Sequence, residues 1–284
     1  MNKLNFLLLF LLLIIITFIT NAQVYSPEDV AICRNKLELA YKNNLRSEPI
    51  NKIIEQIGLS FIGADYKAHT LEETEDESLI INLKGLDCYT FVEATVALAR
   101  CIKNNDTSFN AFLKEIENLR YRNGDMKGYA SRLHYFSDWI YEMQKRGIGK
   151  DITEEIGGIP YNKKINFMSS HTKSYKQLAD NRKLTDSIAL IENEISSRKY
   201  YYIPQKMIRR IESKLLSGDI IGITTNIPGL DISHTGIAVK GRDGRIHLLH
   251  APDVGKKVEI TKLPLAEYIE SHSKQTGIMV LRIN

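Results

Sequence analysis

The sequence has few cysteines and no stretch typical of a linker, a repeat array or a nucleic-acid-binding arm. Cysteine occurs 3 times in 284 residues, which excludes a small scaffold held together by disulfides. The 38 basic and 34 acidic residues give a formal net charge of +4 and form no block of one sign, so no nucleic-acid partner is expected. With 43% hydrophobic residues the chain can bury a substantial core, and residues 23–284 are predicted to form a single domain.

The first 22 residues have the pattern of a secretory signal peptide. Lys3 precedes an apolar run over residues 6–19, and the small residues Thr20 and Ala22 fit a cleavage site before Gln23. The run is short for a membrane span, although an uncleaved N-terminal anchor stays an alternative. We therefore expect a periplasmic or secreted protein with no stable membrane anchor after cleavage.

Export makes the odd number of cysteines informative, because at least one of Cys33, Cys88 and Cys101 must stay unpaired. A bridge between Cys33 and Cys101 is left open. Apolar residues recur at helical spacing over residues 91–102, so Cys88 is predicted to begin a helix with Asp87 as its N-cap. The N–H groups and dipole of a helix start favour an anion, so the position suits a reactive thiolate and an oxyanion. A buried core cysteine is the alternative for Cys88 taken alone.

Two histidines on neighbouring predicted strands strengthen the catalytic interpretation. Residues 235–240 and 245–251 are predicted strands joined by a turn at residues 242–244. If these strands pair, the alternation of side chains puts His234 and His250 on one face. His234 can then activate the thiol while His250 holds its other ring nitrogen. His247 falls on the opposite face and is interpreted as structural.

The order of predicted elements indicates an α+β fold. Helical spacing appears twice within residues 26–58, then at residues 88–102, 109–119, 133–145 and 207–215. Residues 178–204 are expected to be helical at first and then rich in tyrosine. Strands are predicted at residues 220–223, 235–240, 245–251 and 277–283, with a short one near residues 79–83. Helices that precede strands of this kind are typical of an antiparallel sheet with segregated helices.

Four motifs occur in the order found in NlpC-type (NlpC/P60) cell-wall cysteine peptidases, and the sequence resembles that superfamily. The motifs are Leu86-Asp87-Cys88, Gly218-Asp219-Ile220-Ile221, Ser233-His234-Thr235-Gly236-Ile237 and Leu249-His250-Ala251. The resemblance implies a papain-like core in which a nucleophile-bearing helix packs on an antiparallel sheet. It makes Cys88 the nucleophile, His234 the base and His250 the residue that orients the base. Asp219 is interpreted as structural.

Departures from the common pattern resemble one branch of that superfamily, the N-acetylmuramoyl-L-alanine amidases. Tyr89-Thr90 replaces the usual aromatic–glycine pair, more than a hundred residues separate Cys88 from His234, and no wall-targeting repeat is present. The branch has a helical insertion, here about residues 103–205, that enlarges the cleft. The resemblance implies cleavage of the amide between N-acetylmuramic acid and L-alanine through a thioester acyl-enzyme, with no cofactor and no metal.

Residues 132–139 and 167–171 resemble substrate-contacting segments of that branch. Arg132 and His134 supply a cation and an imidazole, which suit a sugar-peptide that carries carboxylates. For Phe136 and Trp139 a place on the core face of a helix is nearly as well supported. The expected substrate-binding residues are Asp87, Tyr89, Arg132, His134, Tyr135, Ser170, His171 and Ser233.

The expected partner is peptidoglycan or its soluble muropeptide fragments. Other functions stay open at this point: an endopeptidase that cleaves within the stem peptide, a non-catalytic wall-binding relative, and a transferase or deamidase that uses the same acyl-enzyme. A zinc site made by Cys88, His234 and His250 is disfavoured, because zinc hydrolases usually have closely spaced ligands.

Overall fold

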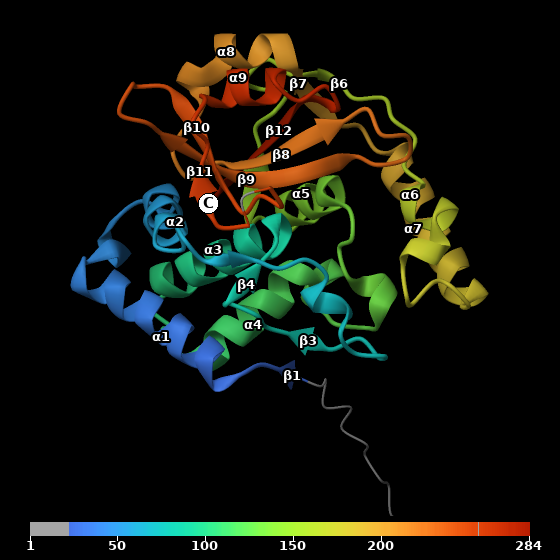
Figure 1. Cartoon of the computed structure of the whole chain (residues 1–284), viewed down its shortest axis with the longest axis horizontal. Helices are drawn as coiled ribbons and strands as arrows, with labels where there is room; N and C mark the ends of the chain where they lie inside the picture. The colour runs from blue at the N-terminus through green and yellow to red at the C-terminus, as the bar shows by residue number, and fades with distance from the viewer. Residues whose placement is uncertain (1–22, 255) are drawn as a thin grey trace, which may run out of the picture.

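The helices lie mainly in the first two thirds of the chain (Figure 1). The computed structural model describes residues 23–254 and 256–284, so the predicted signal peptide, residues 1–22, lies outside the described part. No helix within those ranges is both long and apolar enough to cross a membrane. The helices are α1 (Pro27–Lys42), α2 (Ile50–Leu59), α3 (Cys88–Lys103), α4 (Phe109–Arg120), α5 (Phe136–Lys145), α6 (Phe167–Ser170), α7 (Arg182–Ser197), α8 (Ile208–Ile211) and α9 (Leu265–Glu270).

The longer strands lie in the last third of the chain and form a central sheet. Its order is β11-β10-β9-β8-β12-β7-β6, β5 also pairs with β12, and every one of these pairings is antiparallel. Two small parallel pairs, β1 with β3 and β2 with β4, lie apart from it. The strands are β1 (Gln23–Val24), β2 (Asp65–Tyr66), β3 (Leu79–Ile80), β4 (Gly85–Leu86), β5 (Gly149–Asp151), β6 (Ile159–Pro160), β7 (Tyr201–Pro204), β8 (Ile220–Thr225), β9 (Ile232–Lys240), β10 (Ile246–His250), β11 (Glu259–Ile260) and β12 (Gln275–Ile283).

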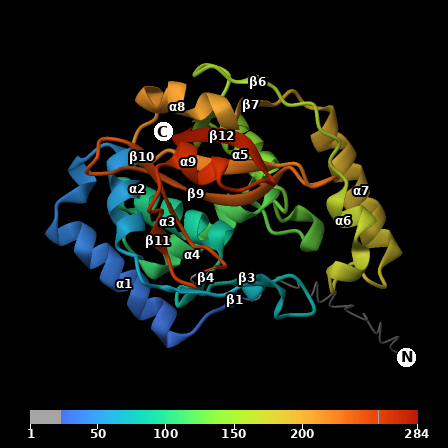
Figure 2. The same cartoon turned by 45° about the horizontal axis from the view of Figure 1, so that its top comes forward.

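The central sheet separates two layers of helices, which Figures 1 and 2 show from two directions. Helices α8 and α9 cover one face, and α2, α3 and α5 lie on the other. Side chains alternate along the strands, so each face contributes to its own core. Ile237 and Leu249 belong to the core on the α3 side, whereas Ala238 and Leu248 belong to the core under α8 and α9.

Helix α3 is the central helix of the fold. It contacts α2, α4 and β9, and its side chains from Thr90 to Ala99 are all buried. A helix that is apolar on nearly every side can only be stable inside the protein. Its start is therefore fixed against the sheet, which gives Cys88 a defined position.

The prediction of a mixed protein with helices followed by an antiparallel sheet is confirmed at this level. The helix predicted over residues 133–145 begins later, at Phe136, because Tyr121 bridges Arg132 and the amide of Leu133 donates to the carbonyl of Arg120. The helix predicted over residues 207–215 is shorter, since α8 lies between two 3₁₀ turns, Gln205–Met207 and Glu212–Lys214. Helix α9 was not predicted.

Candidate active site

Cys88 is the first residue of α3, as the sequence predicts. Asp87 has extended backbone angles (φ −87°, ψ 179°) and accepts a hydrogen bond from the amide of Thr90 at 2.7 Å. In return, the amide of Asp87 donates to the hydroxyl of Thr90 at 3.0 Å. This reciprocal capping satisfies two donors that a helix start otherwise leaves free, and it fixes the direction in which Cys88 enters the helix.

Thr235 joins the start of α3 to strand β9. Its hydroxyl donates to the carbonyl of Cys88 at 2.7 Å, and its backbone N–H and hydroxyl also lie against the thiol. Burial and the charge of Asp87 raise the pKa of the Cys88 thiol to about 12, while these Thr235 contacts lower it. These shifts run against the thiolate expected at the helix start. Cys88 is half-buried, and desolvation favours the neutral form of its thiol.

A β-bulge sets the direction of His234. Ile223 pairs with His234 and the next residue, Thr224, pairs with Ile232, so Ser233 has no partner on β8. Bulges of this kind bend a strand and redirect its side chains next to functional sites. Ser233 is exposed at the bulge, and the hydroxyl of Thr235, two residues later, reaches the carbonyl of Cys88 at the start of α3.

The two histidines form a direct pair, as predicted. Nε2 of His234 and Nδ1 of His250 are 2.7 Å apart, and the rings are close to perpendicular at 83°. Nδ1 of His234 makes no hydrogen bond to any described residue, and no hydrogen bond joins it to the Cys88 thiol. The ring nitrogen that would take the thiol proton is thus unoccupied.

The surroundings of both histidines favour the uncharged imidazole. Burial, followed by the charge of His272, lowers the pKa of His234 to about 4. Burial together with His234 and His272 lowers the pKa of His250 to about 3. Burial thus raises the pKa of the thiol and lowers the pKa of both imidazoles, against the thiolate–imidazolium pair expected from the sequence.

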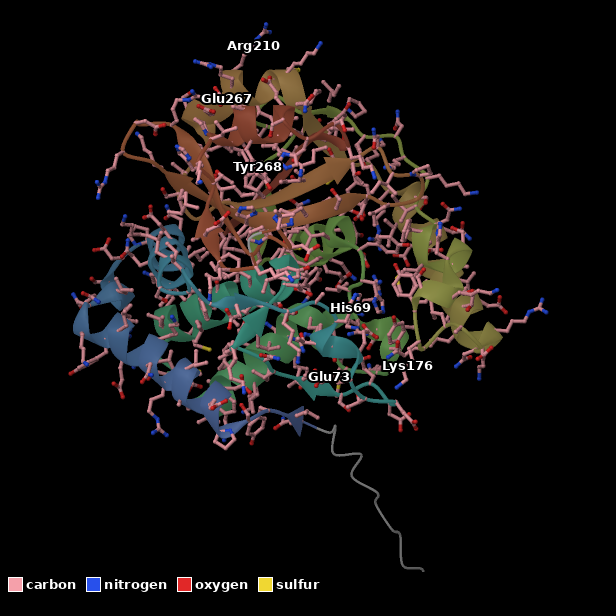
Figure 3. All side chains as sticks on the ribbon, viewed as in Figure 1. His69, Glu73, Lys176, Arg210, Glu267 and Tyr268 are labelled. Carbon is pink, nitrogen blue, oxygen red and sulfur yellow. The ribbon has the colours of Figure 1, made fainter. Side chains whose placement is uncertain are left out.

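A cavity of about 180 Å³ is lined by both sequence neighbours of Cys88, Asp87 and Tyr89, and has walls of mixed polarity. Four of the predicted substrate-binding residues line it: Asp87, Tyr89, Arg132 and His134. The remaining lining comes from His69, Leu71, Glu72, Thr90, Arg120 and Leu133. In Figure 3, His69 is labelled on the segment that leads toward β3, below the sheet.

Arg132, one of the two arginines that line the cavity, is already paired with protein carboxylates. Arg132 is buried, its Nη2 lies 2.7 Å from Glu72 and its Nε lies 3.4 Å from Glu77. His134 stacks on Tyr129, with Nε2 2.8 Å from that residue's carbonyl oxygen. Burial and the charge of Arg132 lower the pKa of His134 to about 3. These two residues shape the cavity, but they do not offer a free positive charge for a substrate carboxylate.

Three other predicted contacts, Tyr135, Ser170 and His171, do not line this cavity. Tyr135 is buried and donates to Glu192 of α7 at 2.6 Å, which makes it part of the packing between α5 and α7. Ser170 and His171 are exposed near the end of α6, and the His171 ring stacks on Phe167 at 4.3 Å. Thr235 thus links the strand of His234 to Cys88, and four predicted residues line one cavity, whereas these three residues belong to neither group.

Several residues near the thiol were not assigned from the sequence. Thr235 belongs to the motif Ser233-His234-Thr235-Gly236-Ile237, and this is the one sequence signal that could have identified it. Tyr66 lies on β2, paired beside β4, and the charges of Cys88 and Asp87 help raise its pKa to about 12. Tyr268 of α9 packs edge-on to His250, with ring centroids 5.4 Å apart. Tyr66 and Tyr268 come close only through the fold, and neither belongs to a motif.

Asp219 and His247, which are interpreted from the sequence as structural, both make polar contacts within the protein. Asp219 is fully buried, and both its oxygens lie 2.7 Å from the guanidinium of Arg282. His247 is buried and bonds the carbonyl of Thr261 at 2.8 Å. Among the residues that the structure describes, no three His, Cys, Asp or Glu side chains are grouped closely enough to hold a metal ion.

A family model described as AmiA-like, N-acetylmuramoyl-L-alanine amidase-like, matches residues 56–278. The chain belongs to this family. The matched residues contain Cys88, His234, His250 and the whole lining of the cavity, whereas α1 lies outside them. None of the curated proteins matches the chain significantly.

Several solved structures are similar to the chain over most of its length. An N-acetylmuramoyl-L-alanine amidase from Bacteroides uniformis is 37% identical, with a TM-score of 0.75 over 83% of this chain and 99% of that one. A Bacteroides fragilis protein suggested to be a xylanase is also 37% identical, with a TM-score of 0.73 over 80% of this chain and 98% of that one. A Legionella pneumophila protein of the DUF1460 family, 23% identical, shares the fold with a TM-score of 0.69 over 90% of this chain and 94% of that one.

Proposed function

We propose that this member of the amidase-like family is a cysteine hydrolase that cleaves the amide between N-acetylmuramic acid and L-alanine in peptidoglycan or muropeptides. The observation that carries the proposal is the histidine pair, in which Nε2 of His234 lies 2.7 Å from Nδ1 of His250, on the strand whose next residue, Thr235, donates to the carbonyl of Cys88 at the start of α3. Family membership and the amidase name of the Bacteroides uniformis neighbour support the cell-wall substrate.

In the proposed reaction the proton moves as the sulfur attacks, because thiol and imidazole are both neutral at rest. Nδ1 of His234 takes the proton from Cys88, and sulfur bonds to the carbonyl carbon of the muramic lactyl group. Protonated His234 gives that proton to the alanine nitrogen, and the carbon–nitrogen bond breaks. Water, deprotonated by His234, then attacks the thioester, which releases the lactyl carboxylic acid and restores the thiol.

In the proposed reaction the start of α3 stabilises the oxyanion that forms during attack, and not the thiolate of the resting protein. Negative charge on the carbonyl oxygen develops only during attack, next to the N–H groups at the N-terminus of a 16-residue helix. Donors fixed in this position stabilise the transition state more than the ground state. The helix terminus therefore lowers the barrier even though burial keeps the sulfur protonated beforehand.

The cavity beside Cys88 is the proposed seat of the muramic acid ring. Its walls combine the carboxylates of Glu72 and Asp87 with the ring of Tyr89, and its arginines are ion-paired. Carboxylates accept hydrogen bonds from hydroxyl and amide groups, and aromatic rings pack on sugar faces. Such walls favour a hydroxyl-bearing ring over a free carboxylate.

The wider setting is proposed from the sequence. The central sheet with α3 would be the papain-like core of the NlpC type, and residues 103–205 its helical insertion. Residues 1–22 would direct export, so the enzyme would act in the periplasm or outside the cell without a cofactor. The antiparallel pairing of β8, β9 and β10 beside α3 supports this core.

Mass spectrometry of digested muropeptides tests the function. The protein comprising residues 23–284 should release free L-alanyl peptides and leave an intact muramic acid. Cys88→Ala should release none, whereas Cys101→Ala, which removes a buried cysteine from the same helix, should keep the activity.

Other products would identify other enzymes. Peptides cut within the stem would indicate an endopeptidase, and shortened glycan chains would indicate a glycosidase. Activity that survives Cys88→Ala, or its absence in the unaltered protein, would overturn the proposal.

A further inference from the structure

The histidine pair has one buried nitrogen without a hydrogen-bond partner. Nδ1 of His250 is taken by His234, while Nε2 of His250 is buried and unpartnered. A buried unsatisfied polar atom is unusual in a folded protein. The groups around Nε2 of His250 therefore affect which ring nitrogens of His234 and His250 carry a hydrogen.

Two neutral tautomers of the pair are possible, and they differ in reactivity. In the first, Nε2–H of His234 donates to Nδ1 of His250, Nδ1 of His234 is bare, and His250 carries its hydrogen on the buried Nε2. In the second, His250 donates, and Nδ1 of His234 carries a hydrogen. Only the first can accept the proton of Cys88, and this step rests on the function proposed above.

The ring of Tyr268 lies against the ring of His250. Its ring lies 5.4 Å from His250 with an interplanar angle of 78°, so one ring meets the other edge to face. His250 is 2% exposed, and Tyr268 packs on it from α9, on the face of the sheet opposite α3. In Figure 3, Tyr268 lies nearer the strands than Glu267 and Arg210, which lie toward the upper edge.

The face of an aromatic ring is negative and its edge is positive. An N–H directed at that face is attracted, whereas a bare nitrogen lone pair is repelled. We propose that Tyr268 is a positioning residue: its ring face receives Nε2–H of His250 and thereby keeps Nδ1 of His234 free to accept the thiol proton. The phenol hydroxyl has no part in this contact, so phenylalanine can replace tyrosine.

Nitrogen-15 NMR of histidine side chains measures the tautomers directly in the whole folded protein. In the unaltered protein and in Tyr268→Phe, His234 should carry its hydrogen on Nε2. In Tyr268→Leu the population should shift toward the Nδ1–H form, and kcat should fall roughly twofold to fivefold, as a weak N–H–aromatic contact allows. KM should change little.

A matched control removes an edge-on aromatic pair elsewhere. Tyr25 packs on Phe109 at 5.0 Å and 69°, far from the histidines in sequence and on other elements, and Tyr25→Leu should leave tautomer and rate unchanged. Equal losses in Tyr268→Phe and Tyr268→Leu would overturn the proposal, as would a His234 that carries its hydrogen on Nδ1 in the unaltered protein. That last measurement decides even if Tyr268→Leu does not fold. Correct tautomers in a protein that cleaves no muropeptide would refute the proposed function alone.

Discussion

Two polar clusters of the protein differ in charge: the histidine pair on the sheet and the ion-paired arginines Arg120 and Arg132. His234 and His250 are neutral, share one hydrogen bond and leave Nε2 of His250 unpartnered. In the arginine cluster, the guanidinium of Arg120 donates to both oxygens of Glu93 and to the carbonyl of Ile80, the latter at 2.6 Å. Arg132 is paired with two further carboxylates.

This difference distinguishes groups that can take part in the reaction from framework groups, which stabilise the fold. A proton acceptor needs a free nitrogen, so its cluster must leave a hydrogen-bonding position open. A buried ion pair must satisfy its charges, because an unpaired buried charge is strongly destabilising. The histidine cluster should therefore control rate, and the arginine cluster should control stability.

Replacing the proposed base should have the largest effect on rate. His234→Ala should lower kcat/KM roughly 10²- to 10⁴-fold, the range of general acid–base catalysis, with little change in the free energy of unfolding. His250→Ala should lower it less, since it acts through His234. Steady-state kinetics on a muropeptide and urea unfolding measure the two quantities.

His247 provides the control for that comparison, since it lies on the same strand as His250 and bonds Thr261 and Asp243 instead. His247→Ala should lower stability and leave kcat/KM close to its original value. Equal rate losses in the His247 and His234 variants would break the distinction between reactive and framework histidines.

Removing one partner of the buried ion pair should have the next largest effect, on stability. Glu93→Gln leaves the charge of Arg120 buried and unpaired, so the free energy of unfolding should fall by about 3–5 kcal/mol in urea titrations. The double variant Glu93→Leu with Arg120→Met should recover part of that loss. If Glu93→Gln unfolds no more readily than the original protein, the arginine cluster is not framework.

The protonation state of the thiol predicts how alkylation depends on pH. Since the pKa of Cys88 is raised to about 12, the thiolate fraction, and with it the rate of reaction with iodoacetamide, should grow about tenfold per pH unit from pH 6 to pH 9. Cys88→Ala should react far more slowly, because Cys33 and Cys101 are buried. A rate that is constant below pH 8 would instead indicate a preformed thiolate–imidazolium pair.

The smallest effect concerns stability in mild acid. His134, His234 and His250 have pKa values lowered from 6.5 to about 3 or 4, so between these values the unfolded chain binds more protons than the folded one. The free energy of unfolding should fall as the pH drops from about 6.5 to about 4. His134→Gln should make this fall less steep without changing the tautomer of His234. A pH dependence equal to that of the original protein would contradict the shift assigned to His134.

The sequence by itself determined the features that depend on local spacing and local chemistry. Helical periodicity and an acidic N-cap placed Cys88 at a helix start, because capping involves residues three positions apart. Strand alternation and a two-strand turn placed His234 and His250 on one face. The quoted motifs led to the amidase-like family to which the chain belongs.

Only the tertiary structure decided the properties that depend on long-range burial and pairing. The sequence predicts that Arg132 offers a cation to the substrate. In the structure, Glu72 and Glu77, more than fifty residues away in the chain, pair with its charge. The helix start around Cys88 predicts a thiolate, yet desolvation and the charge of Asp87 raise the pKa of the thiol. Tyr268 meets His250 from a helix that no local pattern indicated. Desolvation and contacts of this kind arise from the whole packed chain, and no short stretch of sequence contains them.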